Sequence, residues 1–206
     1  AGTYQSGTAP GYWEPNNRCT TTNLPPMYQV NWAVTFRAGD YWSGNHLHLP
    51  GGDSDLLAMT SDPKLVMPNK TGLSPWITID LWTFCCIANL QSGESGEGFI
   101  GYAPDGRKIT FDWMDNRFYT NIARNLSFGN GHVSAAIDRV QSRIYPTRIE
   151  DRFGNWVTYT WTHVTVSYGT LSRLTRILAS DGREIDLSYD PVTENLVSAT
   201  AAGRTW

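Results

Sequence analysis

Four glycine-centred turns, each followed by a strand-like run of residues, constrain the fold of this chain more than any other feature. The turns are centred on Gly106, Gly154, Gly182 and Gly203. Glycine adopts positive backbone φ values at little steric cost, and tight turns between antiparallel strands require such values. An aspartate precedes the glycine in two of the turns, as Asp105 and as Asp181. The pattern predicts a series of β-hairpins.

The residues that follow the turns alternate between apolar and polar side chains. The apolar positions are Ile109, Phe111 and Trp113 after the first turn, Val157, Tyr159 and Trp161 after the second, and Ile185, Leu187 and Tyr189 after the third. A period of two indicates half-buried strands. One hairpin cannot bury its apolar face alone, so neighbouring hairpins must lie side by side in a longer sheet. We therefore expect an all-β fold in which antiparallel β-hairpin repeats form an extended, curved sheet.

Upstream of these repeats, the sequence predicts further strands between long loops. Residues 28–36 alternate between apolar and polar side chains, and the apolar run Trp76–Leu90 is rich in β-branched and aromatic residues. Both segments are predicted to be strands. Residues 99–102 and 109–113 flank the first glycine turn and predict a hairpin. The segment Ser134–Arg143 is interpreted as a short helix.

Three regions follow from these patterns. Residues 1–27, rich in Gly, Pro, Asn and Thr, form an irregular lead-in. Residues 28–143 form a pre-repeat β region with long loops, and residues 144–206 form the hairpin repeats. The last strand is incomplete at Trp206, and an open strand edge recruits partners. We expect further chain or another subunit to supply the next strand.

Composition excludes several classes of protein. Hydrophobic residues make up 40% of the chain and charged residues 17%, which is typical of a folded domain rather than a disordered one. The formal net charge is −3 and no basic stripe is present, so nucleic acid is not expected as a partner. No run of about 18 apolar residues exists that could cross a membrane as a helix.

The chain contains 3 cysteines, Cys19, Cys85 and Cys86. If the adjacent pair lies in a strand, its side chains point to opposite faces, so at most one can readily face Cys19. A disulfide would imply an oxidising compartment, whereas three reduced, buried thiols would suit a cytosolic protein. The residues alone leave both alternatives open.

The third hairpin resembles the YD repeat of bacterial Rhs/YD-repeat proteins. Its sequence, Ser180-Asp-Gly-Arg-Glu-Ile-Asp-Leu-Ser-Tyr-Asp190, has a Gly-Arg turn, a strand, and a closing Tyr189-Asp190. Five further segments are similar to other parts of the family. Leu174–Ile177 and Leu196–Thr200 resemble the strand that follows such turns. Tyr145–Asn155 resembles the segment that opens the array of repeats. Tyr41–Gly51 and Gly96–Gly106 resemble the region that precedes this array. The resemblance runs from about residue 19 to the end.

This resemblance implies a non-catalytic structural or assembly segment of a secreted or surface-exposed bacterial protein. In that family, a long β-sheet coils into a hollow shell that can enclose a toxic carboxy-terminal domain. The expected partners are further Rhs/YD repeats, or copies of this chain that form an extracellular polymer through edge strands. In similar proteins, one cysteine follows a Trp at the place of Cys86, and a partner cysteine lies where this chain has Cys19. The resemblance thus implies a Cys19–Cys86 disulfide.

A carbohydrate-binding β module on the bacterial surface is the main alternative, because the chain contains 9 tryptophans and aromatic faces stack on sugar rings. Trp156 and Trp161 are separated by an odd number of residues, so a regular strand places one on each face. The tryptophans expected to be exposed or at an interface are Trp42, Trp156, Trp161 and Trp206.

A glycoside hydrolase is the third hypothesis. The candidate acid pairs are Glu94 with Glu97 and Asp105 with Asp112, but nothing in the sequence fixes either pair at a working distance. His46 and His48, near Asp53 and Asp55, could hold a metal ion, but ordinary polar side chains on a strand beside a loop explain them better. We predict no catalytic residue, no metal and no cofactor.

Overall fold

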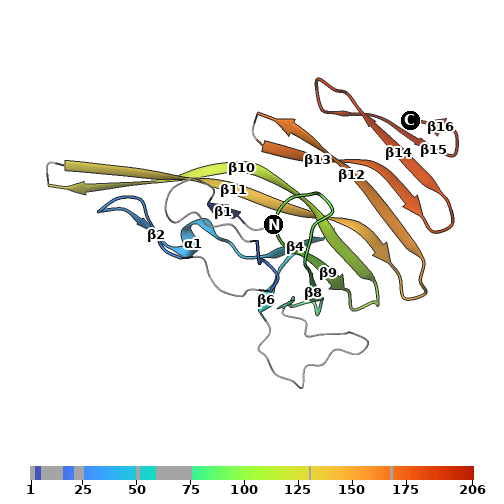
Figure 1. Cartoon of the computed structure of the whole chain (residues 1–206), viewed down its shortest axis with the longest axis horizontal. Coiled ribbons are helices and arrows are strands. Elements are labelled where there is room, and N and C mark those ends of the chain that lie inside the picture. The colour runs from blue at the N-terminus through green and yellow to red at the C-terminus, as the bar shows by residue number, and fades with distance from the viewer. Residues whose placement is uncertain are drawn as a thin grey trace, which may run out of the picture.

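The computed structural model describes residues 3–5, 16–20, 26–49, 52–58, 76–129, 131–167 and 169–206. Within these ranges the chain is nearly all β, with one helix of 4 residues, α1 (Ala38–Tyr41). All strand pairs are antiparallel, which confirms the all-β, antiparallel part of the predicted fold (Figure 1). None of the described residues forms a helix of the length and hydrophobicity that a membrane crossing requires.

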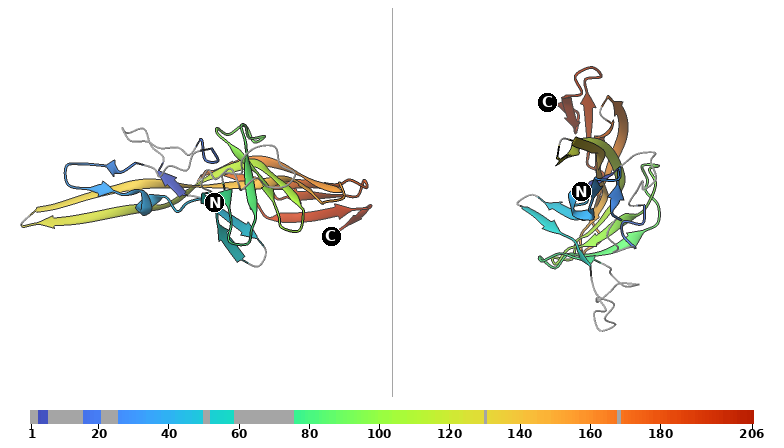
Figure 2. Two further views of the ribbon diagram at one scale, coloured as in Figure 1. Left: turned by 90° about the horizontal axis from the view of Figure 1, so that it is seen from below. Right: turned by 90° about the vertical axis from the view of Figure 1, so that its left-hand side faces the viewer.

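One sheet of 12 strands dominates the molecule (Figure 1). Its strands are β6 (Leu57–Ala58), β7 (Trp76–Ile77), β8 (Thr83–Ile87), β9 (Gly98–Tyr102), β10 (Lys108–Phe128), β11 (Gly131–Glu150), β12 (Trp156–Val166), β13 (Gly169–Ala179), β14 (Glu184–Tyr189), β15 (Leu196–Ala201) and β16 (Arg204–Thr205), with β1 (Thr3–Gln5) paired to β11. Strands β6 to β16 pair in sequence order. The sheet is therefore a meander, and Figure 2 shows that it bends instead of lying flat.

The hairpin of β10 and β11 projects beyond the other strands of the sheet as a long arm (Figures 1 and 2). The segment Ser134–Arg143 lies within β11, so the prediction of a helix there is wrong. Ala135 and Ile137 are buried, whereas Ala136 and Asp138 are exposed. This period of two belongs to a strand, and the segment pairs with β10 on both sides of a register shift at Asp138.

A small apolar core covers one part of this arm. It is built from β2 (Tyr28–Gln29), β3 (Thr35–Phe36) and α1, whose buried rings pack against Ala135 and Ile137. One strand was predicted for residues 28–36, but β2 and β3 form a hairpin instead. The Asn31 side chain causes this turn, because its Oδ1 accepts hydrogen bonds from the amides of Ala33 at 3.0 Å and Val34 at 2.9 Å.

The predicted strand Trp76–Leu90 is also divided. Strand β7 ends at Ile77 and β8 begins at Thr83, with a turn between them. In this turn Leu81 has a φ of 63°, a value that non-glycine residues rarely adopt. The turn is closed by the amide of Thr78, which donates to the carbonyl of Trp82 at 2.9 Å.

A larger core lies on strands β7 to β11. Its buried members are Cys19, Leu47, Trp76, Trp82, Phe84, Phe99, Ala103 and Ile109. A disulfide between Cys19 and Cys86 ties the turn at residues 16–20 to β8, which confirms the predicted pairing. The indole Nε1 of Trp76 donates to the carbonyl of Cys19 at 2.7 Å and fixes the same attachment. Cys85 is half-buried and is not part of the disulfide.

Strands β10 to β13 close into a ring, because β13 pairs with β12 along its length and also meets β10 where Gly169 faces Arg117. Only glycine fits this crossing. The φ of Gly169 is +126°, and a Cβ atom there would lie 2.6 Å from the carbonyl oxygen of Asn116. The fully buried Asp115 holds the crossing by accepting a hydrogen bond from the amide of Ser172 at 2.9 Å.

Candidate functional site

The first three predicted glycine turns share one set of backbone hydrogen bonds. In each, the glycine amide donates to the carbonyl three residues earlier, and the amide of that earlier residue donates to the carbonyl after the glycine. The φ values of Gly106, Gly154 and Gly182 are 89°, 87° and 84°. These features define a three-residue hairpin loop with a glycine bulge. The three turns are therefore copies of one unit.

The fourth turn is different. Ala201 pairs with Arg204 across β15 and β16, so only two residues connect these strands. Both of them, Ala202 and Gly203, have positive φ values of 49° and 76°. This is the two-residue hairpin turn that right-twisted strands favour, rather than a fourth copy of the three-residue loop.

Aspartates stabilise two of the three copied turns in the same way. Asp105 accepts a hydrogen bond from the amide of Arg107 at 3.1 Å, and Asp181 accepts one from the amide of Arg183 at 3.2 Å. Each carboxylate also accepts from the Nε of the same arginine. These hydrogen bonds, led by those from the backbone, lower the pKa of both aspartates below the usual carboxyl value.

An aromatic residue marks the same place in each hairpin. Trp113, Trp161 and Tyr189 each stand at a register shift in their strand pairs. The indole of Trp161 donates to the carbonyl of Pro146 at 2.8 Å, and the hydroxyl of Tyr189 donates to the carbonyl of Leu174 at 2.9 Å. Both rings thus reach back to the preceding strand. The sequence showed the spacing of these rings but not this bonding role.

Asp190, the second residue of the Tyr-Asp pair, closes the loop after β14. Its Oδ1 accepts hydrogen bonds from the amides of Val192 at 2.8 Å and Thr193 at 2.6 Å. These backbone hydrogen bonds lower the pKa of Asp190. The guanidinium of Arg173 lies 5.3 Å above the Tyr189 ring. Tyr189 therefore fixes the strand, and Asp190 fixes the turn that follows it.

Apolar side chains form a continuous row on one face of the repeat sheet. The members of this apolar row are Ile109, Ile149, Val157, Tyr159, Ile177, Ala179, Ile185, Leu187 and Ala199, joined by direct cross-strand pairing. Ile109 is 5% exposed in the large core, whereas Ile185 is 38% exposed. No described residue after Thr147 is buried. The row is thus buried at Ile109, half-buried over most of β12 to β15, and exposed at Ile185.

Two of the four tryptophans predicted to be exposed lie against other side chains. The Arg148 guanidinium is 4.8 Å from the Trp156 ring, and the Tyr145 ring is 4.7 Å from that of Trp161. Trp42 is half-buried beside a pocket. Trp206 is 69% exposed, although its backbone pairs with Ala199.

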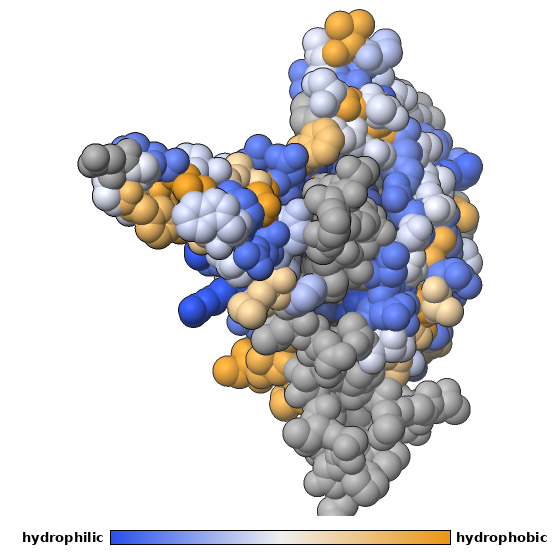
Figure 3. Space-filling view, turned by 60° about the vertical axis from the view of Figure 1, so that its left-hand side comes forward, coloured by the Kyte–Doolittle hydropathy of each residue, from blue (hydrophilic) through white to orange (hydrophobic). Residues whose placement is uncertain are grey.

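The arm of β10 and β11 carries a second group of exposed rings. Phe118 is 64% exposed and Phe128 is 48% exposed. Trp32, from the bend between β2 and β3, lies with its ring centre 5.6 Å from that of Phe128. Figure 3 shows apolar side chains among polar ones on this projecting part of the molecule.

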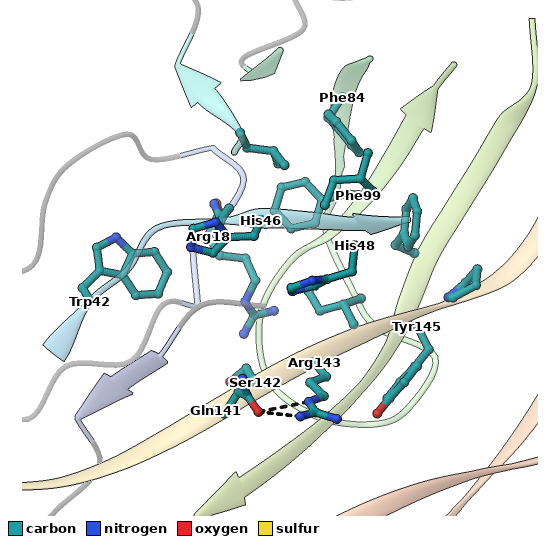
Figure 4. A pocket seen from close by; sticks show the side chains of 16 residues that line it. Arg18, Trp42, His46, His48, Phe84, Phe99, Gln141, Ser142, Arg143 and Tyr145 are labelled. Carbon is teal, nitrogen blue, oxygen red and sulfur yellow. Dashed lines mark hydrogen bonds between the residues drawn. The ribbon is translucent and has the colours of Figure 1, made fainter. Parts of the chain in front are cut away.

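A pocket of about 470 Å³ opens between β4 (His46–Leu49) and the inner part of β11 (Figure 4). Arg18, His46 and His48 lie on one side of the pocket, and strand β11 lies on the other. The lining residues are Arg18, Trp42, Asn45, His46, Leu47, His48, Leu56, Phe84, Phe99, Phe111, Gln141, Ser142, Arg143, Ile144, Tyr145 and Pro146. No local sequence pattern predicted this pocket, because seven separate segments of the chain contribute to it.

The candidate metal ligands form two separate pairs. Strand β5 (Gly52–Asp55) pairs with β4, so the Nδ1 of His46 lies 2.6 Å from Asp55 and that of His48 lies 2.7 Å from Asp53. Within the described ranges, no three His, Cys, Asp or Glu side chains gather closely enough to hold a metal ion.

The candidate hydrolase acids have structural roles. Glu97 accepts hydrogen bonds from the amides of Cys19 and Thr20, and so holds the disulfide-bonded turn. Asp112 is buried and accepts a hydrogen bond from the Thr147 hydroxyl. Asp105 belongs to the first copied turn.

Comparison with protein-family models, curated proteins and solved structures gave no match. Function is therefore inferred from the geometry of this chain.

Proposed function

We propose that this chain is a non-catalytic wall segment of a secreted or cell-surface protein of the Rhs/YD type. Its repeat sheet provides one layer of a larger β-sheet wall, and adjoining hairpins of the same kind cover its apolar row. The observation that carries the proposal is the lack of any buried residue after Thr147 in the described part of the chain. Four long or medium strands, β12 to β15, lie in this region.

An uncovered row of apolar side chains is costly for an isolated sheet. Complete burial of one large aliphatic side chain contributes about 1.5–3 kcal/mol relative to its exposed state. The row continues through Ile185 and Leu187, and Leu196 nearby is 54% exposed. A sheet needs a second layer, or more sheet that curves over it, to gain this free energy. Adjoining repeats would supply that cover.

The copied turns support the same function. The chain contains three turns with the same backbone hydrogen bonds, and each turn is followed by a strand with an aromatic ring at the same place. Such repetition is typical of a modular array. Such units gain stability mainly from their neighbours. The Cys19–Cys86 disulfide supports an extracellular setting, because disulfides form and persist in oxidising compartments.

The proposal is tested by measuring self-association, since copies of the chain can provide the missing cover. Size-exclusion chromatography with light scattering should show species above the monomer mass of 23.0 kDa, which increase with concentration. Ile185→Glu places a charge in the apolar row and should weaken this association. Val192→Glu is the control, because Val192 is 85% exposed in a turn outside the row. A wild-type chain that stays monomeric at every concentration would contradict the proposal.

Sugar binding is a second candidate, and the exposure of Trp206 is the observation that favours it. Titration with soluble glycans, followed by tryptophan fluorescence, tests this function. A saturable response that Trp206→Ala removes would support it, whereas a wall segment should give no saturable response.

A further inference from the structure

The arm formed by β10 and β11 has an open edge along β10. On this side, β10 pairs with β9 over residues 108–111 and meets β13 at Arg117. From there to Phe128, β11 is its only partner among the described strands (Figures 1 and 2). Residues 122–128 pair with β11 without a register shift, and we call this stretch of β10 the arm edge. A strand edge of this kind presents unpaired N–H and C=O groups to solvent.

The turn at the arm tip determines which backbone groups point outward. Only two residues connect β10 to β11, and the first of them, Gly129, has a φ of 54°, as this tight hairpin turn requires. The two residues that flank such a turn bond to each other, and the bonding then alternates along the antiparallel strands. Every second residue of the arm edge therefore directs its N–H and C=O groups away from β11. These outward residues are Ala123, Asn125 and Ser127, and no backbone hydrogen bond joins them to any other described segment.

The arm edge lacks the features that keep edge strands apart. Exposed edges usually carry lysine, proline or a bulge that prevents pairing with another chain. The arm edge contains no proline and one charged residue, Arg124. This arginine turns onto the face covered by β3 and α1, where it pairs with Asp40 at 2.7 Å and donates to the carbonyl of Thr35 at 3.0 Å. The edge is therefore able to accept another strand.

The apolar side chains beside the arm edge are only partly covered. Ile137 on β11 is 3% exposed, whereas its cross-strand partner Ile122 is half-buried. Leu126 is also half-buried, and the exposed ring of Phe128 lies beside the exposed ring of Trp32. The small core thus covers the β11 side of the arm more completely than the β10 side. A strand added at the arm edge would bury these apolar groups.

We propose that the arm edge pairs with the arm edge of a second copy of this chain, in antiparallel orientation about a twofold axis at Asn125. Only this register lets every outward residue of both copies form hydrogen bonds. It places Ala123 of one copy opposite Ser127 of the other, and Asn125 opposite its own counterpart. Each such pair exchanges two hydrogen bonds, so the contact contains about six.

The side chains fit this register. Ile122 of one copy lies opposite Phe128 of the other, and Leu126 lies opposite Arg124, so apolar groups meet and the two arginines do not face each other. The opposite face of the joined sheet carries only the outward residues, which are short and uncharged. The arm edge is separate from the apolar row, so this contact does not depend on the wall function.

Cysteine cross-linking tests the register directly. In a hydrogen-bonded antiparallel pair the two Cα atoms lie about 5.5 Å apart, a distance that a disulfide spans. Asn125→Cys, combined with Cys85→Ser to remove the thiol outside the native disulfide, should therefore form a covalent dimer of twice the 23.0 kDa monomer mass on mild oxidation. Ser134→Cys in the same background is the matched control, because Ser134 is also exposed and pairs with Asn125 across the arm but belongs to the other edge. No dimer from Asn125→Cys, or equal cross-linking of the two variants, would overturn the proposal.

Proline substitution tests the same contact without a thiol, in an Ile185→Glu background that weakens association through the apolar row. Asn125→Pro removes an outward N–H at the centre of the contact and should raise the dimer dissociation constant at least about tenfold in sedimentation equilibrium. Ser134→Pro removes an outward N–H from the other edge and should change this constant little. Circular dichroism checks that both variants fold. An Ile185→Glu chain that stays monomeric, or equal effects of the two prolines, would overturn the arm contact and leave the wall function standing.

Discussion

Asp112 and Thr147 are the two unpaired residues of a double bulge at the base of the long hairpin, where the register shifts on both strands. The Thr147 hydroxyl donates to the Asp112 carboxylate, and both side chains are buried. Burial raises the pKa of Asp112, and the hydrogen bonds from Thr147 and Gln91 only partly offset this effect. The ionised form of Asp112 therefore costs stability in the folded chain.

Asp112→Asn should raise the melting temperature at neutral pH. The raised pKa means that the native chain binds the proton more tightly than the unfolded chain, so stability falls as the pH rises through the native pKa. Asparagine keeps an oxygen that can accept from Thr147 but carries no charge. Near pH 3 the Asp112 carboxyl of the wild-type chain is protonated in both the native and the unfolded state. Thermal unfolding at this pH should therefore show little difference between the variant and wild type. The exposed Asp138→Asn is the control, and a lower melting temperature at neutral pH would contradict this prediction.

Cys86→Ser should lower the free energy of unfolding by about 4 kcal/mol, because the disulfide closes a loop between residues 67 positions apart. Cys85 should not replace Cys86, since adjacent strand residues point to opposite faces. Urea unfolding of the variant should match that of the reduced wild-type chain. Recovery of a Cys19–Cys85 bond by peptide mapping, with stability retained, would contradict the prediction.

At the scale of elements, the closed ring of β10 to β13 depends on one glycine. Gly169→Ala should cost at least about 1–3 kcal/mol, because the φ of +126° is unfavourable for alanine and its Cβ would meet Asn116. Gly131→Ala, at the start of β11 in the neighbouring β10–β11 hairpin, is the control, since its added Cβ has only an ordinary contact at 3.5 Å. Equal stability of the two variants in urea unfolding would show that the crossing is not constrained as described.

The copied turns should weaken in acid. The lowered pKa values of Asp105 and Asp181 mean that their stabilising effect is complete above the usual carboxyl pKa and is lost as the pH falls through the lowered value. Carboxyl chemical shifts in an NMR titration should place both midpoints below 3.8. Asp181→Ala should speed amide exchange in the β13–β14 hairpin near neutral pH. Unchanged amide exchange in the β13–β14 hairpin would show that Asp181 does not stabilise this turn.

The sequence predicts elements well where local rules decide. Gly106, Gly154 and Gly182 identify their turns because positive φ is a property of the residue itself. The turn between β7 and β8 was missed because Leu81 adopts positive φ through its surroundings. The helix predicted at Ser134–Arg143 failed because tertiary pairing, not local preference, sets the period there. The pocket combines distant segments, so no local pattern could indicate it.

On the scale of the whole molecule, the chain has a covered part and an uncovered part. Both apolar cores end by Ile149, while no described residue of β12 to β16 is buried, and β14 to β16 lie outside the ring of β10 to β13. Local stability follows the density of buried contacts. The two parts should therefore open independently.

Hydrogen exchange tests this division. Amides of β8 to β11 near the large core should exchange only through global unfolding, whereas those of β14 and β15 should exchange through partial opening at lower free energy. Association of chains, or added repeats, should slow exchange in β14 and β15 selectively. A uniform protection pattern across the sheet would contradict the division.

The anchored rings have a geometric consequence. Each lies at a register shift, where one strand of the pair has one residue more than the other. Such irregularities bend a strand and increase its twist. Trp113, Trp161 and Tyr189 occupy the same place in their hairpins, so each hairpin carries an irregularity at the same distance from its turn. Under the proposed wall function, we expect a ribbon built from such units to curve as it lengthens rather than to extend flat.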